Sequence, residues 1–362
     1  MSWHAVDAVD DAVEATRRFL FPFSLVRWTK LAVLVLLMGG GVSANASFPV
    51  VPDADGTVLE ALTGVSNGPL DGLEGIDGEL VAGLSEGGLF AAVVGAVLIV
   101  VVLSVVSLSL RLVFYDALHT NEIRLWRPFV SRFRQAIGLF AVSTAIWAAA
   151  ATPVVLVVLV ATASASPIGW APLDTLFTAL GTLSTGPSLA FGLAGAVFTP
   201  LGLLALRLTY EFIVPTMIVE DCGVIAAWKR AWAPLRGSLA DVAVYLVVHF
   251  VIAVGLSILE GITAALIGGA VVVAAGVVLL IIAGALGGLG SLIGTTAGIA
   301  SIALVGAVAL VALLVLFSPV RVVTRSYLIS YEVSTLGGID PSLAMLDPDI
   351  DPSAATPHST DS

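Results

Sequence analysis

Four polar side chains lie at helical spacing in the apolar segment 239–260. Asp241, Tyr245 and His249 follow one another at intervals of four, and Glu260 continues the same face. On a helix this spacing places the groups on one side. Ionisable groups within a membrane span are costly, and they are typical of proton or ion paths. These four residues form a candidate intramembrane polar face, which serves either as such a path or, in the interpretation we favour, as hydrogen-bonding contacts between helices.

The residues that could support catalysis are sparse. The sequence GLSEG at 83–87 has the Gly-x-Ser-x-Gly pattern of a nucleophile around Ser85, but that pattern requires a preceding strand, a following helix and a nearby histidine. The topology derived below leaves this loop without a histidine. The chain has one cysteine, Cys222, which excludes an intrachain disulfide and a cysteine-rich metal site. We therefore expect no enzyme, no metal and no cofactor.

The composition is that of an integral membrane protein. Hydrophobic residues make up 58% of the chain and charged residues 11%, whereas soluble domains have about 45–50% and about 25%. The net charge of −11 excludes the basic surface of a nucleic-acid-binding protein. Only Lys30 and Lys229 are lysines. Carboxylates with so few lysines indicate a high-salt organism, and an acidic surface loop is the alternative explanation.

A membrane span needs about 20 apolar residues, and six segments qualify. They are roughly 28–46, 88–110, 136–163, 189–206, 239–260 and 294–317. A further apolar run at 266–288 would make seven spans and would place Arg321 and Arg325 on the opposite side. We favour six core spans, with 266–288 as a re-entrant or buried helix.

The distribution of basic residues orients these spans, because short cytoplasmic loops are enriched in lysine and arginine. Bases are found before or at the start of the first span, in 111–135, in 207–238 and after the last span. The segment 47–87 contains eight acidic residues and no basic residue. In the segment 164–188, Asp174 is the one charged residue. The sequence predicts a plasma-membrane protein with cytoplasmic N- and C-termini and an acidic outer loop at 47–87.

An Arg-x3-Pro pattern recurs at a constant offset of 106 residues, which predicts three helical hairpins at about 22–111, 128–207 and 234–321. Arginine and tryptophan are stable at the headgroup level, and proline is compatible with the first turn of a helix. Each copy therefore reads as an interfacial elbow. The elbow residues are Arg18, Pro22, Arg124, Trp126, Pro128, Arg230, Trp232, Pro234 and Arg236. The predicted fold is an all-α, polytopic membrane helix bundle of three hairpin repeats.

The two ends of the chain differ from the transmembrane bundle, which we place at 28–325. Residues 1–27 predict a cytoplasmic amphipathic segment. Its apolar face contains Trp3, Val6, Val9, Val13, Thr16, Phe19 and Leu20, and its charged face contains Asp7, Asp10, Asp11, Glu14 and Arg17. Residues 333–362 are rich in proline, aspartate and serine, which predicts a disordered acidic cytoplasmic tail.

One stretch resembles a known family. The sequence IVPTMIVEDCGVIAAWKRAWAPLRGSLADVAVYLVV at 213–248 is similar to the membrane domain of glycerophosphoryl diester phosphodiesterases. The matching positions are Pro215, Glu220, Gly223, Trp228, Arg230, Trp232, Arg236 and Gly237. The whole chain resembles a haloarchaeal family of membrane proteins of unknown function, with SWHAVDAVDDAVEATRRFLFPF at 2–23 as its N-terminal signature. The resemblance implies a membrane fold and no activity, because the phosphodiesterase catalytic domain is a separate soluble module.

Two functions follow as expectations. The first is a non-catalytic membrane protein that organises lipid or partner proteins, with the lipid bilayer and other membrane proteins as its partners. The alternative is a small-solute or ion transporter that uses the polar face of 239–260. The sequence gives no oligomeric state.

Overall fold

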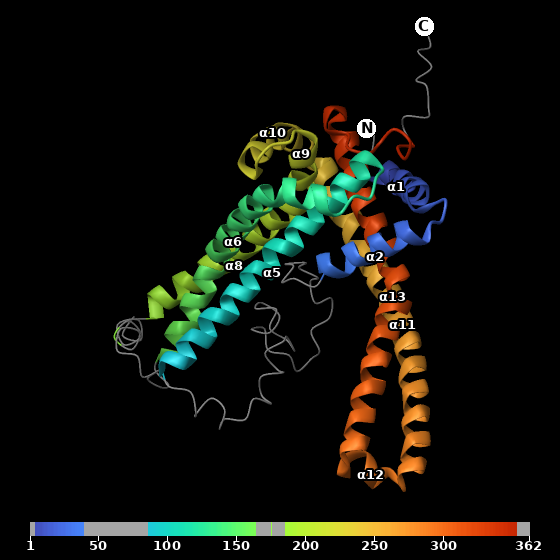
Figure 1. Cartoon of the computed structure of the whole chain (residues 1–362). Coiled ribbons are helices and arrows are strands. Elements are labelled where there is room, and N and C mark those ends of the chain that lie inside the picture. The colour runs from blue at the N-terminus through green and yellow to red at the C-terminus, as the bar shows by residue number, and fades with distance from the viewer. Residues whose placement is uncertain (1–3, 40–85, 164–174, 176–184, 353–362) are drawn as a thin grey trace. The chain divides into compact units, whose positions relative to one another are not determined.

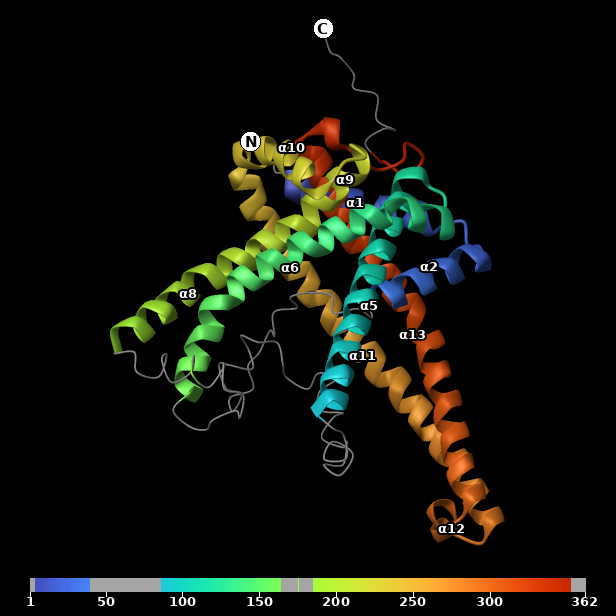
Figure 2. The ribbon, with the colours of Figure 1, turned by 60° about the vertical axis from the view of Figure 1, so that its left-hand side comes forward.

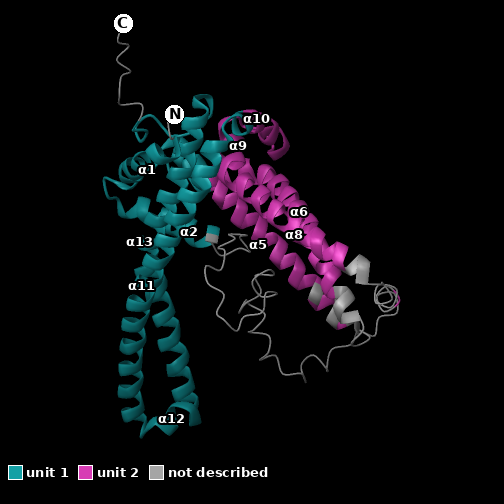
Figure 3. Cartoon of the chain, turned by 180° about the vertical axis from the view of Figure 1, so that it is seen from behind, with its two compact units in different colours: residues 1–40, 114–125, 234–362 teal, residues 41–113, 126–233 magenta. Residues whose placement is uncertain are grey.

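The computed structural model describes residues 4–39, 86–163, 175 and 185–352, and all regular secondary structure in these residues is helical (Figure 1). The chain forms two compact units (Figure 3). Unit 1 comprises residues 1–40, 114–125 and 234–362, and unit 2 comprises residues 41–113 and 126–233. Each unit packs helices that are distant in the sequence.

Five described helical segments are long and apolar enough to cross a membrane, which confirms an all-helical protein of the membrane type. They are Val94–Thr120, Trp126–Val158, Leu189–Val219, Leu239–Leu286 and Thr296–Ile339. The first predicted span, 28–46, is described only through α2 (Leu25–Gly39). The rest of that span and nearly all of the predicted outer loops 47–87 and 164–188 lie outside the described residues. Six spans therefore stay a prediction.

The structure corrects the division between the fifth predicted span and the run 266–288. Helix α11 (Leu239–Leu286) passes through both without interruption. Between them stands Gly-Ile-Thr-Ala-Ala, and one glycine costs a helix only about 1 kcal/mol. The helix ends at Gly287, whose φ of 95° lies in the left-handed region that favours glycine. Residues 266–286 are therefore the continuation of a long helix and not a separate re-entrant one.

A short turn joins α11 to a second long helix. Helix α12 (Leu289–Gly294) leads to Thr295, whose hydroxyl accepts a hydrogen bond from the Gly298 N–H and caps α13 (Thr296–Ile339). Helices α11 and α13 run antiparallel and in contact (Figures 1 and 2). With 48 and 44 residues, they are about 72 and 66 Å long. Both exceed the bilayer hydrocarbon thickness of about 30 Å.

The N-terminal helix α1 (His4–Leu20) packs against α13 and α11 within unit 1. The apolar face predicted for this helix is buried only in part, because Thr16, Phe19 and Leu20 are buried whereas Val6 and Val13 are exposed. The buried face contains four small residues, Ala5, Ala8, Ala12 and Ala15. Alanine allows close approach of the helix backbones, and a Cβ added at Gly338 of α13 would lie 3.1 Å from His4 Cβ.

The C-terminal segment is ordered further than the sequence predicted. The disorder predicted for 333–362 is wrong for residues 333–352, because α13 continues to Ile339 and a 3₁₀ turn, η3 (Pro341–Leu343), follows. Leu343, Met345 and Ile350 are buried. These apolar residues, spaced between aspartates and prolines, provide enough burial to fix the segment. Residues 353–362 lie outside the described residues.

The three Arg-x3-Pro copies do not share a local structure. Pro22 lies between α1 and α2, Pro128 lies in the first turn of α6 (Trp126–Ala163), and Pro234 lies in the last turn of α10 (Val224–Gly237). Proline is compatible with each place for a different reason, since it suits a linker and a first helical turn and is tolerated near a helix end. The predicted hairpin repeat is therefore not confirmed.

Unit 2 contains the first part of α5 (Glu86–Thr120), α6 and α8 (Thr185–Leu208). Helices α6 and α8 lie side by side in Figures 1 and 2. The Thr199 hydroxyl donates to the Ala150 carbonyl at 3.1 Å, and Gly202 lies directly against Ala150. A π-helical turn (Thr209–Ile213) then leads to α9 (Val214–Val219) and α10. Pro215 lacks an N–H for the usual helical bond, which is compatible with this widened turn.

Replacement of Gly202 by alanine is expected to destabilise the α6–α8 pair. The new Cβ would meet Ala150 Cβ, a short side chain with no rotamer freedom, so the two backbones must move apart. We expect a loss of about 1–3 kcal/mol, seen as a lower thermal unfolding midpoint of the purified protein. Gly192→Ala on the same helix is the control, because open space surrounds that position. Equal midpoints for the two variants would contradict the close packing.

Candidate functional site

Unit 1 contains a cluster of polar and aromatic side chains at its core. We call it the Tyr–His–Glu cluster, and its members are Tyr115 of α5, Tyr245 and His249 of α11, and Tyr331 and Glu332 of α13. All five side chains are buried. Tyr245 and His249 are one helical turn apart, so both are on the face of α11 that packs against α13.

Hydrogen bonds and ring contacts within the cluster join three helices. The Tyr245 hydroxyl and His249 Nδ1 are 2.9 Å apart. The Tyr331 ring stacks on Tyr245, with centroids 5.4 Å apart and planes at 17°. The Tyr331 hydroxyl donates to the Ala5 carbonyl at 3.0 Å. The cluster thus connects α11, α13 and α1.

Glu332 is the acidic member of the cluster. Its Oε2 accepts a hydrogen bond from the Tyr115 hydroxyl at 2.7 Å, which provides a partner that a buried carboxylate requires. Ligand atoms of His249 and Glu332 lie within 4.8 Å of each other. Imidazole nitrogens and carboxylate oxygens are atom types that bind metals. In unit 1 an observed contact of the Glu332 carboxylate is the hydrogen bond from Tyr115.

The structure divides the predicted polar face of α11. Tyr245 and His249 meet in the cluster, whereas Asp241 lies in the first turn of α11 and is half-buried. Glu260 lies further along the helix, and its carboxylate accepts a hydrogen bond from the Thr324 hydroxyl of α13. The four residues therefore do not form one continuous polar track among the described residues.

Sequence reasoning missed Tyr115, Tyr331 and Glu332. The last two follow the final predicted span, close to the point where the disordered tail was predicted to begin. A signal was available, because Ile329, Val333 and Leu336 continue a helical spacing of buried apolar residues beyond Arg325.

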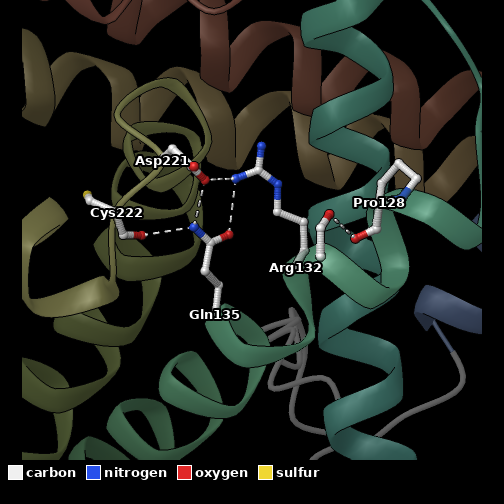
Figure 4. Close-up of polar contacts among 6 residues, drawn as sticks. Pro128, Arg132, Gln135, Asp221 and Cys222 are labelled. Atoms are coloured by element: carbon white, nitrogen blue, oxygen red, sulfur yellow. Dashed lines mark hydrogen bonds and ion pairs between the residues drawn. The ribbon is translucent and has the colours of Figure 1, made fainter.

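A second polar contact lies in unit 2, where α6 holds the turn between α9 and α10 (Figure 4). Arg132 Nη1 is 2.6 Å from Asp221 Oδ1, and the Arg132 side chain is only 14% exposed. Gln135 Nε2 donates to Asp221 Oδ1 at 3.3 Å and to the Cys222 carbonyl at 3.2 Å. Asp221 has a left-handed φ of 44°, which aspartate tolerates better than most residues. These contacts fix the turn.

This turn belongs to the stretch 213–248, for which the sequence predicted a resemblance to phosphodiesterase membrane domains, and two of the predicted matching residues form an ion pair. Arg230 Nε donates to Glu220 Oε1 at 3.1 Å, joining α10 to the end of α9. Burial, followed by the charges of Glu220 and Asp221, raises the pKa of the Cys222 thiol. A thiol held in its protonated form is a poor nucleophile. The geometry of the turn favours a structural role.

Among the elbow residues, the two tryptophan rings are exposed, and three of the arginines form ion pairs. Trp126 is 78% exposed and Trp232 is 49% exposed, as tryptophans at a headgroup layer would be. Arg18 pairs with Glu14 at 2.9 Å, and Arg124 pairs with Glu122 at 2.6 Å.

Acidic side chains gather where α1 meets the C-terminal segment. Burial and the nearby carboxylates of Asp351, Asp7 and Asp10 raise the pKa of Asp11. The hydrogen bond from Arg18, with a second one from Arg17, lowers the pKa of Glu14. Charges at this density are costly to remove from water and counter-ions.

Removal of the Tyr331 hydroxyl is expected to weaken the attachment of α1. Tyr331→Phe keeps the ring stack and deletes the bond to Ala5, with an expected cost of about 0.5–1.5 kcal/mol. Thermal unfolding and the rate of trypsin cleavage at Arg17 and Arg18 measure the effect. Tyr327→Phe, one turn earlier on α13, is the control because no hydrogen bond of its hydroxyl is seen among the described residues. Unchanged cleavage in Tyr331→Phe would contradict the attachment.

Comparison with known proteins gives one match. Residues 3–346 match the profile of DUF7544, a family of unknown function. No curated protein and no solved structure matches the chain. The predicted resemblance to haloarchaeal proteins and to phosphodiesterase membrane domains stays a prediction, because neither is linked to the chain by these comparisons. Since the match extends over nearly the whole sequence, the chain belongs to the DUF7544 family of unknown function.

Proposed function

We propose that this protein is a non-catalytic integral membrane protein that carries a folded head on the cytoplasmic side of the plasma membrane and organises lipid or partner proteins there. The head consists of α1, residues 114–120, the first half of α11 at 239–259, and residues 321–352. The second half of α11, α12 and the first half of α13 form a helical hairpin at 261–320. In this proposal the hairpin anchors the protein in the bilayer, and the head contacts lipid or partner proteins.

The observation that carries the proposal is the charge distribution along two continuous helices. Residues 261–320 contain no Asp, Glu, Lys, Arg or His. The other halves of α11 and α13 pack with α1, whose sequence includes Asp7, Asp10, Asp11, Glu14, Arg17 and Arg18. A rigid connection between an uncharged hairpin and a charged assembly is what an anchored head requires.

The termini support a common side for both ends of the chain. Arg18 Nη1 donates to the Asp351 carbonyl at 3.2 Å, and the Asp347 N–H donates to the Leu118 carbonyl at 3.3 Å. The N-terminal helix and the C-terminal segment therefore belong to one assembly. Arg321 and Arg325 follow the hairpin directly, which favours the cytoplasm for this side. The acidic surface of the head suits a high-salt cell, because carboxylates retain water and counter-ions.

The Tyr–His–Glu cluster supports a structural role over a transport path. Its tyrosine hydroxyls bond to His249, Glu332 and Ala5, and its rings stack against one another. A conducting path needs polar groups that continue along the helix. Glu260, the next ionisable residue of α11, bonds separately to Thr324.

Proteoliposomes distinguish the two functions. We expect proton and potassium flux equal to that of protein-free liposomes for the wild type and for His249→Ala. We also expect His249→Ala to lower the unfolding free energy by about 1–3 kcal/mol, because the buried hydrogen bond between the Tyr245 hydroxyl and His249 is lost. Val247→Ala is the control, since Val247 is on the same helix but exposed.

A flux above background in the wild type would contradict the proposal. The transporter function would then be favoured, most directly if His249→Ala abolished the flux without a change in the unfolding midpoint.

A further inference from the structure

We propose that, of helices α11 and α13, the bilayer covers the hairpin 261–320, and that its cytoplasmic boundary lies at Glu260 and Arg321. Residues 239–259 of α11, which the sequence predicted to be the fifth span, then lie outside the hydrocarbon. The partner of the hairpin surface is the acyl-chain layer of a phospholipid bilayer. This inference rests on the membrane anchoring in the proposed function and specifies which residues provide it.

Hydropathy alone does not indicate which half of α11 lies in the bilayer. Residues 242–259 contain no Asp, Glu, Lys or Arg and only the one histidine, His249, and 261–286 contain none of these five residue types. The whole helix is about 72 Å long, so a bilayer core of about 30 Å covers less than half of it. The position of the bilayer along α11 must therefore be inferred from another helix.

Helix α13 indicates where the bilayer lies along the pair, because its two halves differ in charge. Arg321, Arg325 and Glu332 all lie in its second half, and 296–320 are uncharged. The hydrogen bond between Thr324 and Glu260 sets the pairing of the two helices. In an antiparallel pair this contact places 296–320 beside the part of α11 that follows Glu260. The lengths agree, since 261–286 are about 39 Å long and 296–320 about 37 Å.

Helix α1 packs on α11 and α13, and its charged residues oppose its insertion into hydrocarbon. Helix α1 contacts both α11 and α13, and it reaches Tyr331 through its Ala5 carbonyl and Gly338 through His4. It has four acidic and two basic residues in its 17 positions. A charged side chain at the bilayer centre costs about 2.5–3.5 kcal/mol or more. Insertion of 239–259 would bring α1 with it, and several such costs would add.

The hairpin surface is suited to acyl chains and to little else. Large apolar side chains are exposed along both of its helices, among them Leu266, Val272, Val273, Leu280, Ile281, Ile299, Leu304, Val308, Val311 and Val315. A continuous apolar surface of this length is not stable in water. At the proposed boundary, the Arg321 guanidinium lies over the Phe317 ring at 5.2 Å. Such an arginine can extend its charge toward lipid phosphates while its stem stays in apolar surroundings.

Fluorescence quenching by spin-labelled lipids tests the boundary in the full chain. On a Cys222→Ser background, Val247→Cys and Val273→Cys receive a small fluorophore, because both residues are on α11 and are 64% and 67% exposed. The protein is placed in phosphatidylcholine–phosphatidylglycerol vesicles that contain 12-doxyl phosphatidylcholine. We expect quenching at 273 to be several-fold stronger than at 247. Val251→Cys and Leu280→Cys, 64% and 60% exposed, repeat the comparison if a first variant does not fold.

The outcomes separate this inference from the proposed function. Quenching at 247 as strong as at 273, or stronger, would overturn the boundary and leave the anchoring intact. An absence of quenching at both 247 and 273 would overturn the anchoring itself. Quenching confined to 273 supports both.

Discussion

The organisation of unit 1 depends on one constraint, the free-energy cost of a charged side chain in hydrocarbon. Helices α11 and α13 are unusually long, and the hairpin that they form at 261–320 contains no charged residue. Their charged residues Asp241, Glu260, Arg321, Arg325 and Glu332 all lie outside this hairpin. The short helix α12 closes the uncharged end, and α1 packs on the charged end. The same two helices therefore serve as an anchor and as the frame of a folded head.

The Tyr–His–Glu cluster adds directional contacts to the buried apolar side chains of the head. Small alanines let α1 approach α13, and Tyr331 then reaches the Ala5 carbonyl. Tyr245, His249 and Glu332 provide directional bonds where helix faces meet. Buried polar groups with partners specify one arrangement of helices more strictly than apolar contacts do. In unit 2 the Arg132–Asp221 contact has a comparable effect on the α9–α10 turn.

Composition and hydropathy were sufficient to predict a helical membrane protein and the approximate positions of its apolar helices. They failed where tertiary contacts decide the outcome. The break predicted after Glu260 is absent, because hydropathy windows do not reveal whether one helix or two pass through an apolar stretch. The buried face of α1 contains alanines and not valines, because close helix approach outweighed side-chain size. Tyr331 and Glu332 were missed because their partners are more than 80 residues away in the sequence.

The most direct test of the central claim is a cryo-electron microscopy structure of the full chain in a lipid nanodisc. The position of the lipid belt along α11 and α13 gives the answer without a substitution. The account predicts a belt around 261–286 and 296–320, with α1 and the Tyr–His–Glu cluster in the aqueous region. A belt centred on 239–260, with α1 inside the lipid layer, would contradict it.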